Sequence, residues 1–169
     1  MEKWVDQDTA VIADSIYCDD KLVARDTPVT LPEITFLTAE VNAMGTMSAA
    51  ILGLIEDMIT SITKRGVDKN FFTMLTPGAH DYEIRFVQNR MSADGRTRAV
   101  GCKAFITGEA NTIPGIGLEV GSQSENETTI TTTRYLLYVD GEEMLCIDRL
   151  AGICRILGVD HYKKIEEHL

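Results

Sequence analysis

Alternating apolar and polar residues predict β-strands along most of the chain. Two segments are the most regular, since one face of each is apolar: Tyr82, Ile84 and Phe86 in 81–89, and Val100, Cys102, Ala104 and Ile106 in 98–107. Asp94-Gly95 lies between them and predicts the turn of a hairpin. Residues 9–18 alternate more loosely, and residues 28–38 predict a strand that Pro32 restricts to an edge or a bulge.

A second hairpin is predicted for residues 130–148. Two β-rich arms flank Asp140-Gly141, a dipeptide that suits a type I′ turn. Folding the segment at this turn predicts apolar pairs on both faces: Leu137 with Met144 and Tyr135 with Cys146 on one, and Leu136 with Leu145 on the other. A hairpin at a protein surface normally keeps one face polar, so the second apolar face needs a cover from elsewhere.

Two short helices interrupt the β pattern. Residues 66–78 have Asp68 near the start and Pro77-Gly78 at the end, and residues 158–169 have Asp160 as a capping residue. The periodicity of residues 48–63 predicts a further helix, because their apolar residues match helical spacing: Ile51, Leu52, Ile55, Met58, Ile59 and Ile62. Residues 108–128 have no period and are rich in Gly, Ser and acidic residues, which predicts a long mobile loop.

Length and composition indicate a single domain over residues 1–169. The apolar fraction of 44% is sufficient for a core, and no apolar run reaches the ~18 residues of a membrane span. The start of the chain has neither a basic end nor an apolar stretch, so we expect no signal peptide and a cytoplasmic location. The four cysteines form no CxxC pair, which favours small buried hydrophobic residues over disulfides or metal ligands.

Charge excludes one class of function and suggests another. The net charge of −10 argues against a protein that binds nucleic acid tightly, because such proteins need a basic surface. The charge is also segregated, with a net −8 in residues 1–63, +4 in 64–103 and −7 in 104–148. Acidic and basic patches of this kind suit subunits that meet head to tail in copies of themselves.

No catalytic or cofactor motif emerges from the sequence. His80 is a lone loop histidine, and His161 and His168 are too far apart to form a two-ligand helix face. The glycines of "PGIGLEVG" lack the strand-to-helix setting of a phosphate-binding loop. We therefore expect no catalytic residue, no metal and no cofactor, and a protein that is not an enzyme.

Three stretches resemble the major tail tube protein of contractile-tailed phages and of R-type bacteriocins. They are "TLPEI" at Thr30–Ile34, "AEVNAMGTMSAAILGL" at Ala39–Leu54, and "YLLYVDGEEMLCID" followed by "ILGVDHYKKIEEHL". The last is the most specific, with a β-arm, Asp-Gly, a second arm ending in Ile-Asp, a turn and a short helix. This chain departs from the family in having Leu157 where Asn is frequent, and in an N-terminal segment, "TAVIADSIYCDDKLVA", that lacks the usual Gly.

The resemblance implies a mainly β fold, with two antiparallel sheets packed crosswise as a β-sandwich or barrel, a flanking helix and a short C-terminal helix. It also implies that the region matching Ser48–Gly66 is an extended hairpin rather than a helix, which leaves Ala49–Glu56 open between helix and strand. Six subunits would form a ring, and rings would stack into a tube that conducts DNA or ions inside a contractile sheath. A neighbouring subunit or the terminal helix would cover the second face of the Ile130–Asp148 hairpin.

The implied partners are further copies of the chain, the tail sheath protein, and the baseplate, initiator and terminator proteins, with no membrane anchor. The implied location is a virion tail or a bacteriocin particle assembled in the bacterial host cytoplasm. Two alternatives stay open. One is the related ring protein of type VI secretion systems, which shares the fold, and the other is a monomeric β-domain that binds a ligand or acts as an enzyme.

Three groups of residues are expected to act in assembly. The loop Thr38–Ala50, with small residues and two adaptable methionines, is expected to order when the next ring docks, through Val41, Asn42, Met44, Gly45 and Met47. The terminal helix is expected to contact an adjacent subunit through Tyr162, Lys163, Lys164 and Ile165. Acidic residues are expected to line the bore, where they would repel DNA phosphates, or to face the sheath: Glu40, Glu56, Asp57, Glu83, Glu125 and Glu127.

Overall fold

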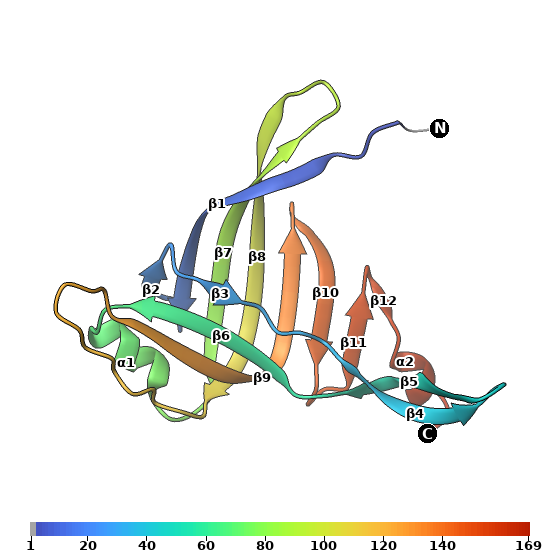
Figure 1. Cartoon of the computed structure of the whole chain (residues 1–169). Coiled ribbons are helices and arrows are strands. Elements are labelled where there is room, and N and C mark those ends of the chain that lie inside the picture. The colour runs from blue at the N-terminus through green and yellow to red at the C-terminus, as the bar shows by residue number, and fades with distance from the viewer. Residues whose placement is uncertain (1–2) are drawn as a thin grey trace.

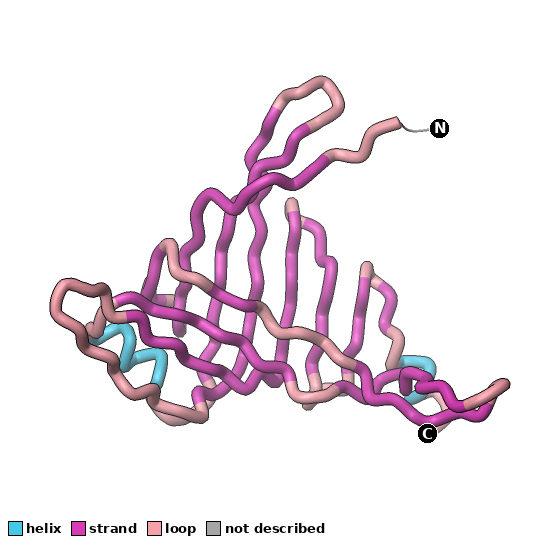
Figure 2. The backbone as a smooth tube through the Cα atoms, viewed as in Figure 1, coloured by secondary structure: helices cyan, strands magenta, loops and turns pink. Residues whose placement is uncertain are grey.

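The computed structural model describes residues 3–169 as a mainly β protein (Figures 1 and 2). Its strands are β1 Gln7–Cys18, β2 Lys21–Arg25, β3 Val29–Thr30, β4 Phe36–Asn42, β5 Thr46–Ile55, β6 Met58–Arg65, β7 His80–Met91, β8 Thr97–Ala110, β9 Glu125–Val139, β10 Glu142–Asp148, β11 Ile153–Ile156 and β12 Val159–Asp160. Its helices are α1 Lys69–Leu75 and α2 Lys163–Glu166. Neither helix within residues 3–169 has the length and apolar character that crossing a bilayer requires.

Ten strands form one antiparallel sheet, and the remaining two form a separate hairpin. The main path runs β12-β11-β10-β9-β8-β7-β1-β2, while β6 pairs with both β3 and β9, and β4 pairs only with β5. Figure 1 shows β3, β6 and the first half of β9 running across the upright strands of the main path. The predicted fold class, mainly β with antiparallel sheets, a helix and a short C-terminal helix, is therefore confirmed.

The crosswise layers belong to one continuous sheet because β9 takes part in both. Its residues Glu125–Thr132 pair with β6 and its residues 134–139 pair with β10, while β8 pairs with residues 130–139 and so spans the junction. The register between β8 and β9 shifts where the two halves meet, since Thr107 pairs with Arg134 but Gly108 pairs with Thr132. The extra residue, Thr133, forms a β-bulge, and bulges bend the strand that carries them.

The core fills the space between these layers. The crossing strands contribute Met58, Ile62 and Ile130, and the upright strands contribute buried residues at alternate positions: Ile16, Cys18, Tyr82, Ile84, Ala104, Ile106, Tyr135, Ile147 and Cys154. The predicted apolar faces of 81–89 and 98–107 thus lie inside, and all four cysteines are buried free thiols. The hydroxyls of Thr60 and Thr132 bond each other at 2.8 Å within the core, so two buried polar groups satisfy each other there.

The helix α1 confirms the helix expected in 66–78. Asp68 occupies the N-cap, and its Oδ1 accepts the backbone N–H of Phe71 at 2.8 Å. Phe71, Met74 and Leu75 are buried on one face. The second helix is shorter than expected: Val159–Asp160 is strand β12, and α2 begins at Lys163. Asp160 nevertheless accepts the backbone N–H of Tyr162 at 2.9 Å.

The predicted Asp140-Gly141 turn is correct, but the pairs beyond it are wrong by one residue. Both turn residues have positive φ, and Glu143 pairs with Tyr138 as expected. Met144 then bulges out, so Leu145 pairs with Leu137 and not with Leu136. The bulge turns Leu145 and Ile147 towards the core, where they join Leu137 and Tyr135. A one-residue slip reverses the face of every later side chain, and the apolar pattern alone did not reveal it.

The helix predicted from periodicity in 48–63 is wrong, and the extended structure implied by the family resemblance is correct. Ala49–Glu56 lies almost entirely in β5, and β6 begins at Met58. The two strands have the apolar spacing of a helix because Glu56 and Asp57 interrupt the alternation between them. As a result Ile51, Ile55, Met58 and Ile62 are three or four positions apart in the sequence. The hairpin itself is β4–β5, however, while β6 leaves it to pair with β3 and β9.

Three further expectations need correction. Residues 28–38 are not one strand, since the chain around Pro32 separates β3 from β4; proline cannot donate to a ladder. The loop expected in 108–128 is shorter, because β8 extends to Ala110 and β9 begins at Glu125. The segment Thr38–Ala50, expected as a loop, is a paired hairpin with Val41 opposite Met47.

Gly108 should tolerate no side chain, because its strand passes too close to β9 at the bend. A Cβ at this position would lie 2.4 Å from the Thr131 carbonyl oxygen, which is backbone and cannot rotate away. We expect Gly108→Ala to lower the free energy of unfolding by about 2 kcal/mol, measured by urea denaturation. Gly101→Ala on the same strand is the control: its Cβ meets nothing within 4 Å, so the change should stay within about 0.5 kcal/mol. Equal effects at both glycines would contradict the close approach.

Leu157 stands where a positive φ favours asparagine. Leu157 and Gly158 have φ of 50° and 81°, which makes a type I′ turn between β11 and β12. A left-handed conformation costs a leucine roughly 1–2 kcal/mol, and asparagine adopts it more readily. We expect Leu157→Asn to stabilise the fold by about 1 kcal/mol, which thermal melts should show as an increase of about 2–4 °C. Leu150→Asn, at an equally exposed residue without positive φ, should give no increase.

Candidate functional site

The hairpin β4–β5 projects from the body of the protein (Figure 1). Several of its apolar side chains are not covered by any other part of residues 3–169. Its tip turns at Met44 and Gly45, which have φ of 51° and 121°, and the Met44 side chain is fully exposed. Val41 and Met47, a cross-strand pair near the tip, are also exposed, as are Leu52 and Leu54 closer to the body. An isolated two-stranded hairpin is at best marginally stable in water, so this one suits a contact with another molecule.

The base of the hairpin rests on the terminal helix. The register of β4 and β5 jumps from Thr38–Ala50 to Phe36–Ile55, so residues 51–54 loop out of the ladder around Gly53. A Cβ on Gly53 would lie 2.4 Å from the Tyr162 ring and 3.3 Å from Ile165. The Tyr162 ring also packs against the core cluster. Two of the four helix residues expected to contact a neighbour, Tyr162 and Ile165, therefore pack within their own chain, and only Lys163 and Lys164 are exposed.

The terminal helix packs on the core side of the main sheet through Tyr162, so it does not cover the opposite, outer face. Phe105 and Tyr138 meet edge to face on this outer face, with ring centroids 5.8 Å apart. Two hollows flank Phe105: one of about 380 Å³ extends to Tyr17 and Leu136, and one of about 580 Å³ extends to Val87 and Lys103. Of the two covers expected for the second face of the Ile130–Asp148 hairpin, the terminal helix is thus excluded.

Ion pairs border this outer face. Arg85 donates to Glu83 at 2.6 Å and lies over the Tyr17 ring, 4.5 Å from its centroid. Arg155 donates to Glu143 at 2.6 Å. These hydrogen bonds raise the pKa of both arginines, so the guanidinium groups stay charged. The rim is therefore polar and charged around an apolar centre, which is the usual anatomy of a protein interface.

The six acidic residues expected at the bore or the sheath lie on separate parts of the structure. Glu40 is on the projecting hairpin opposite Ser48, and Glu56 and Asp57 link β5 to β6. Asp57 bonds Arg149 at 3.0 Å. The other three lie in strands: Glu83 on the outer face beside Arg85, Glu125 near Arg65, and Glu127 hydrogen-bonded to Ser61. Only Glu125 and Glu127 share one strand face.

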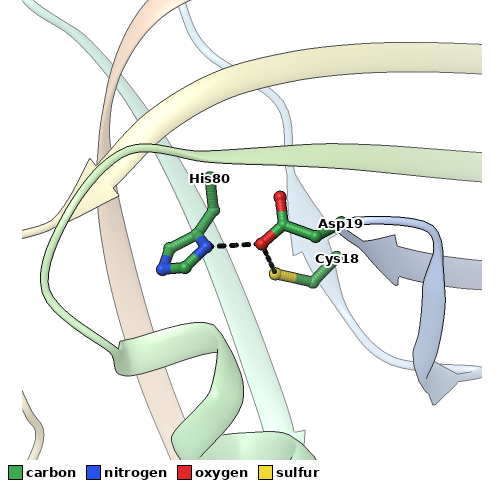
Figure 3. A group of neighbouring side chains, drawn as sticks. All are labelled: Cys18, Asp19 and His80. Atoms are coloured by element: carbon green, nitrogen blue, oxygen red, sulfur yellow. Dashed lines mark hydrogen bonds and ion pairs between the residues drawn. The ribbon is translucent and has the colours of Figure 1, made fainter.

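The structure brings together three chemically reactive side chains that the sequence did not predict to be neighbours (Figure 3). Cys18 ends β1, Asp19 begins the following turn with a φ of 48°, and His80 begins β7. His80 Nδ1 lies 2.7 Å from Asp19 Oδ2, and its Nε2 lies 2.9 Å from the Thr76 carbonyl oxygen. Pairing of β1 with β7 places Cys18 opposite Tyr82 and so brings together Asp19 and His80, which are 61 positions apart in the sequence. The sequence carries no local signal for such a meeting.

Neighbouring side chains in this group shift one another's pKa. The hydrogen bond from His80 lowers the pKa of the Asp19 carboxyl, and the same bond raises the pKa of the His80 imidazole. Burial raises the pKa of the Cys18 thiol to about 11, with the Asp19 and Asp81 carboxylates adding to the increase. The carboxylate is fixed in place, because Asp19 Oδ1 accepts the backbone N–H of Asp81 at 3.1 Å.

Comparison with known proteins agrees with an assembly role for the uncovered surfaces. A model of the family described as phage tail tube protein FII matches residues 10–169. The match includes both helices, the projecting hairpin and all of the main sheet except the first three residues of β1. No curated protein matches the chain significantly.

Proposed function

The chain belongs to the phage tail tube protein FII family, and we propose that it forms hexameric rings that stack into the tube of a contractile tail. Membership itself implies a structural subunit of a virion tail that assembles into a tube with other tail components. The hexameric ring, the surrounding sheath and the passage of DNA or ions through the bore are our proposals. Residues 1–169 act as one tube domain in this proposal, and a sheath protein and baseplate, initiator and terminator proteins are its further partners.

The projecting hairpin is the observation that best supports stacking. It exposes Val41, Met44 and Met47 at a tip that no other part of residues 3–169 covers. Methionine adapts its shape to irregular apolar surfaces, and an exposed apolar group rimmed by polar residues marks an interaction site. A tip that extends beyond the body reaches a subunit in the next ring more readily than a neighbour within the same ring.

The outer face of the main sheet supports contact within the ring. The exposed Phe105 and the half-buried Tyr138 form its aromatic centre, next to the buried Leu136, and aromatic residues are enriched at the centres of interfaces. In a ring the contact is head to tail, so this face would meet a different surface of the adjacent copy. Such a contact, repeated around a closed ring, would cover the second face of the Ile130–Asp148 hairpin in every subunit.

Light scattering coupled to size-exclusion chromatography, followed by negative-stain microscopy, tests the proposal. We expect rings or tubes at high protein concentration, with a hexameric repeat in end-on views. A strict monomer across the concentration range would overturn the proposal and favour a monomeric ligand-binding domain. Rings that never stack, even with an initiating complex, would separate ring formation from the tube.

Replacing Met44 and Met47 with aspartate should prevent stacking without unfolding the subunit. Both side chains are exposed, so the change costs little folding free energy, but it would bury two carboxylates at the ring-to-ring contact. We expect folded subunits that form no long tubes in negative-stain images. Leu150→Asp is the matched control, at an exposed leucine in the β10–β11 turn, and should still give tubes. Long tubes from the double variant would show that the hairpin does not mediate stacking.

Hydrogen exchange adds a test of when the hairpin becomes ordered. The ladder between β4 and β5 is already formed in the subunit, so ordering on docking would be a stabilisation of this ladder rather than the folding of a loop. We expect amides of Val41–Ser48 to exchange rapidly in free subunits and slowly in tubes, because this tip of the hairpin is exposed on both faces. Strong and equal protection in both forms would exclude ordering on docking.

Lys163 and Lys164 remain our proposed contacts with an acidic patch of an adjacent subunit. Tyr162 and Ile165 hold the helix on its own chain, so the lysines present two charges on a fixed element. We expect Lys163→Glu with Lys164→Glu to slow assembly, and the effect to shrink as salt is added, because rim charges act on association rate. Turbidity time courses at two salt concentrations measure this. An unchanged rate at low salt would assign the helix a purely internal role.

We also propose that some of the excess acidic residues line the bore. Glu125 and Glu127 are the strongest pair, since they project from one strand face beside Thr129 and Thr131, which are also accessible. A negative bore would let DNA pass without adhering to the wall. A cryo-EM map of the assembled tube should place several of the six acidic residues at the bore, with the rest towards the sheath. A net basic bore would contradict the idea.

A further inference from the structure

We propose that Cys18, Asp19 and His80 form a binding site for a zinc-class divalent cation, independent of the proposed tube function. One donor atom from each residue, Cys18 Sγ, Asp19 Oδ2 and His80 Nδ1, lies within 4.8 Å of the other two. Figure 3 shows the three side chains converging, with the thiol and the imidazole on either side of the carboxylate. Donors bound to one tetrahedral zinc at about 2.0–2.3 Å lie within such a distance of one another.

The hydrogen bonds of His80 orient its Nδ1 towards Asp19 and away from the backbone, so a metal could replace the proton between them. Nε2 faces the Thr76 carbonyl oxygen at 2.9 Å, which only accepts, so Nε2 carries a proton. In the neutral imidazole Nδ1 is then an unprotonated acceptor, yet it faces Asp19 Oδ2 at 2.7 Å. Two acceptors cannot face each other at that distance, so Nδ1 is protonated as well and the imidazolium donates to Asp19. A tetrahedral zinc in place of this proton would hold the two atoms roughly 3.3 Å apart, which needs only a small shift of the half-exposed Asp19 side chain. Metal-bound histidines typically donate their other N–H to a backbone carbonyl in this way.

The Cys18 thiol adds a third donor. The residue is completely buried, and its sulfur lies 4.0 Å from Asp19 Oδ2 and also interacts with the Tyr82 hydroxyl. Asp19, by contrast, has a half-exposed side chain, so the site has a closed side and a side open to water. Three protein ligands with one position left for a water molecule is a common arrangement for zinc. On binding, the thiol proton and the Nδ1 proton would leave to solvent.

The donor set selects the class of metal. A thiolate, an imidazole and a single carboxylate oxygen favour zinc and chemically similar ions, whereas magnesium and calcium prefer sites made of oxygen alone. The ion would join the β1–β2 turn to the start of β7, and through His80 and Thr76 to the end of α1. It would therefore stabilise the edge of the main sheet, while the projecting hairpin and α2 stay unaffected.

Cobalt binding tests the site directly. Full-length protein, reduced and freed of metal with a chelator, is titrated with Co²⁺ and then with Zn²⁺. We expect a thiolate-to-cobalt absorption band that stops growing once about one Co²⁺ ion per chain has been added. The band should disappear when zinc is added. Zinc should also raise the melting temperature of the subunit, because a ligand that binds only the folded state stabilises it.

Variants assign the ligands. Cys18→Ser should abolish the cobalt band, and Asp19→Asn and His80→Gln should each weaken binding at least about tenfold. The controls are Cys146→Ser, at another buried thiol, and the paired change His161→Gln with His168→Gln, which should both bind like the parent. Asp19→Asn and His80→Gln alter exposed or partly exposed groups and keep side-chain volume, so they decide the question if Cys18→Ser does not fold.

Two results would overturn the proposal. One is no cobalt band and no zinc-dependent stabilisation in the parent protein, which would leave a proton as the only cation between His80 and Asp19. The other is binding that survives Cys18→Ser and His80→Gln but is lost with the two C-terminal histidines. Tube formation is scored separately in each variant, so failure of the metal site would leave the tube proposal standing.

Discussion

The architecture depends on one strand that belongs to both layers. β9 pairs with β6 along its first half and with β10 along its second, β8 spans the junction, and the bulge at Thr133 provides the bend between the halves. Gly108 makes the bend possible because a side chain there would meet the Thr131 carbonyl. One sheet thereby folds back over itself and encloses a core without a second independent sheet. The main cluster of buried apolar residues lies between the two layers that this bend brings together.

Folding a sheet over itself buries one face and leaves the other uncovered. Phe105 and Tyr138 consequently lie on an outer face that no helix of residues 3–169 covers, and residues 37–48 of the β4–β5 hairpin lie outside the folded core. Apolar surface of this kind is a liability for a monomer. In a tube subunit, by contrast, other copies of the chain are expected to bury this apolar surface. Membership of a tail tube family implies such self-assembly.

The Cys18, Asp19 and His80 group depends on pairing of the outermost strands of the main path. β1 pairs with both β2 and β7, and the β1–β2 turn therefore lies next to the first residue of β7. The turn holds Asp19 and Asp20 at positive φ, and backbone bonds with Asp81 fix the Asp19 carboxylate. The group therefore lies at the β1–β7 side of the main sheet, and Asp81, which bonds Asp19, also lines the outer-face hollow next to Tyr17.

The sequence by itself determined the elements whose signals are local. Alternation located β7 and β8, Asp94-Gly95 and Asp140-Gly141 located two turns, Asp68 located the start of α1, and the C-terminal resemblance identified the family. Tertiary structure decided the rest. The bulge at Met144, the break between β5 and β6, the packing of Tyr162 on Gly53 and the meeting of His80 with Asp19 all depend on partners distant in the chain. Strand pairing is non-local, and a shift of one residue reverses which face is buried. Apolar spacing therefore predicts that a strand exists, whereas its partner and its register depend on the folded sheet.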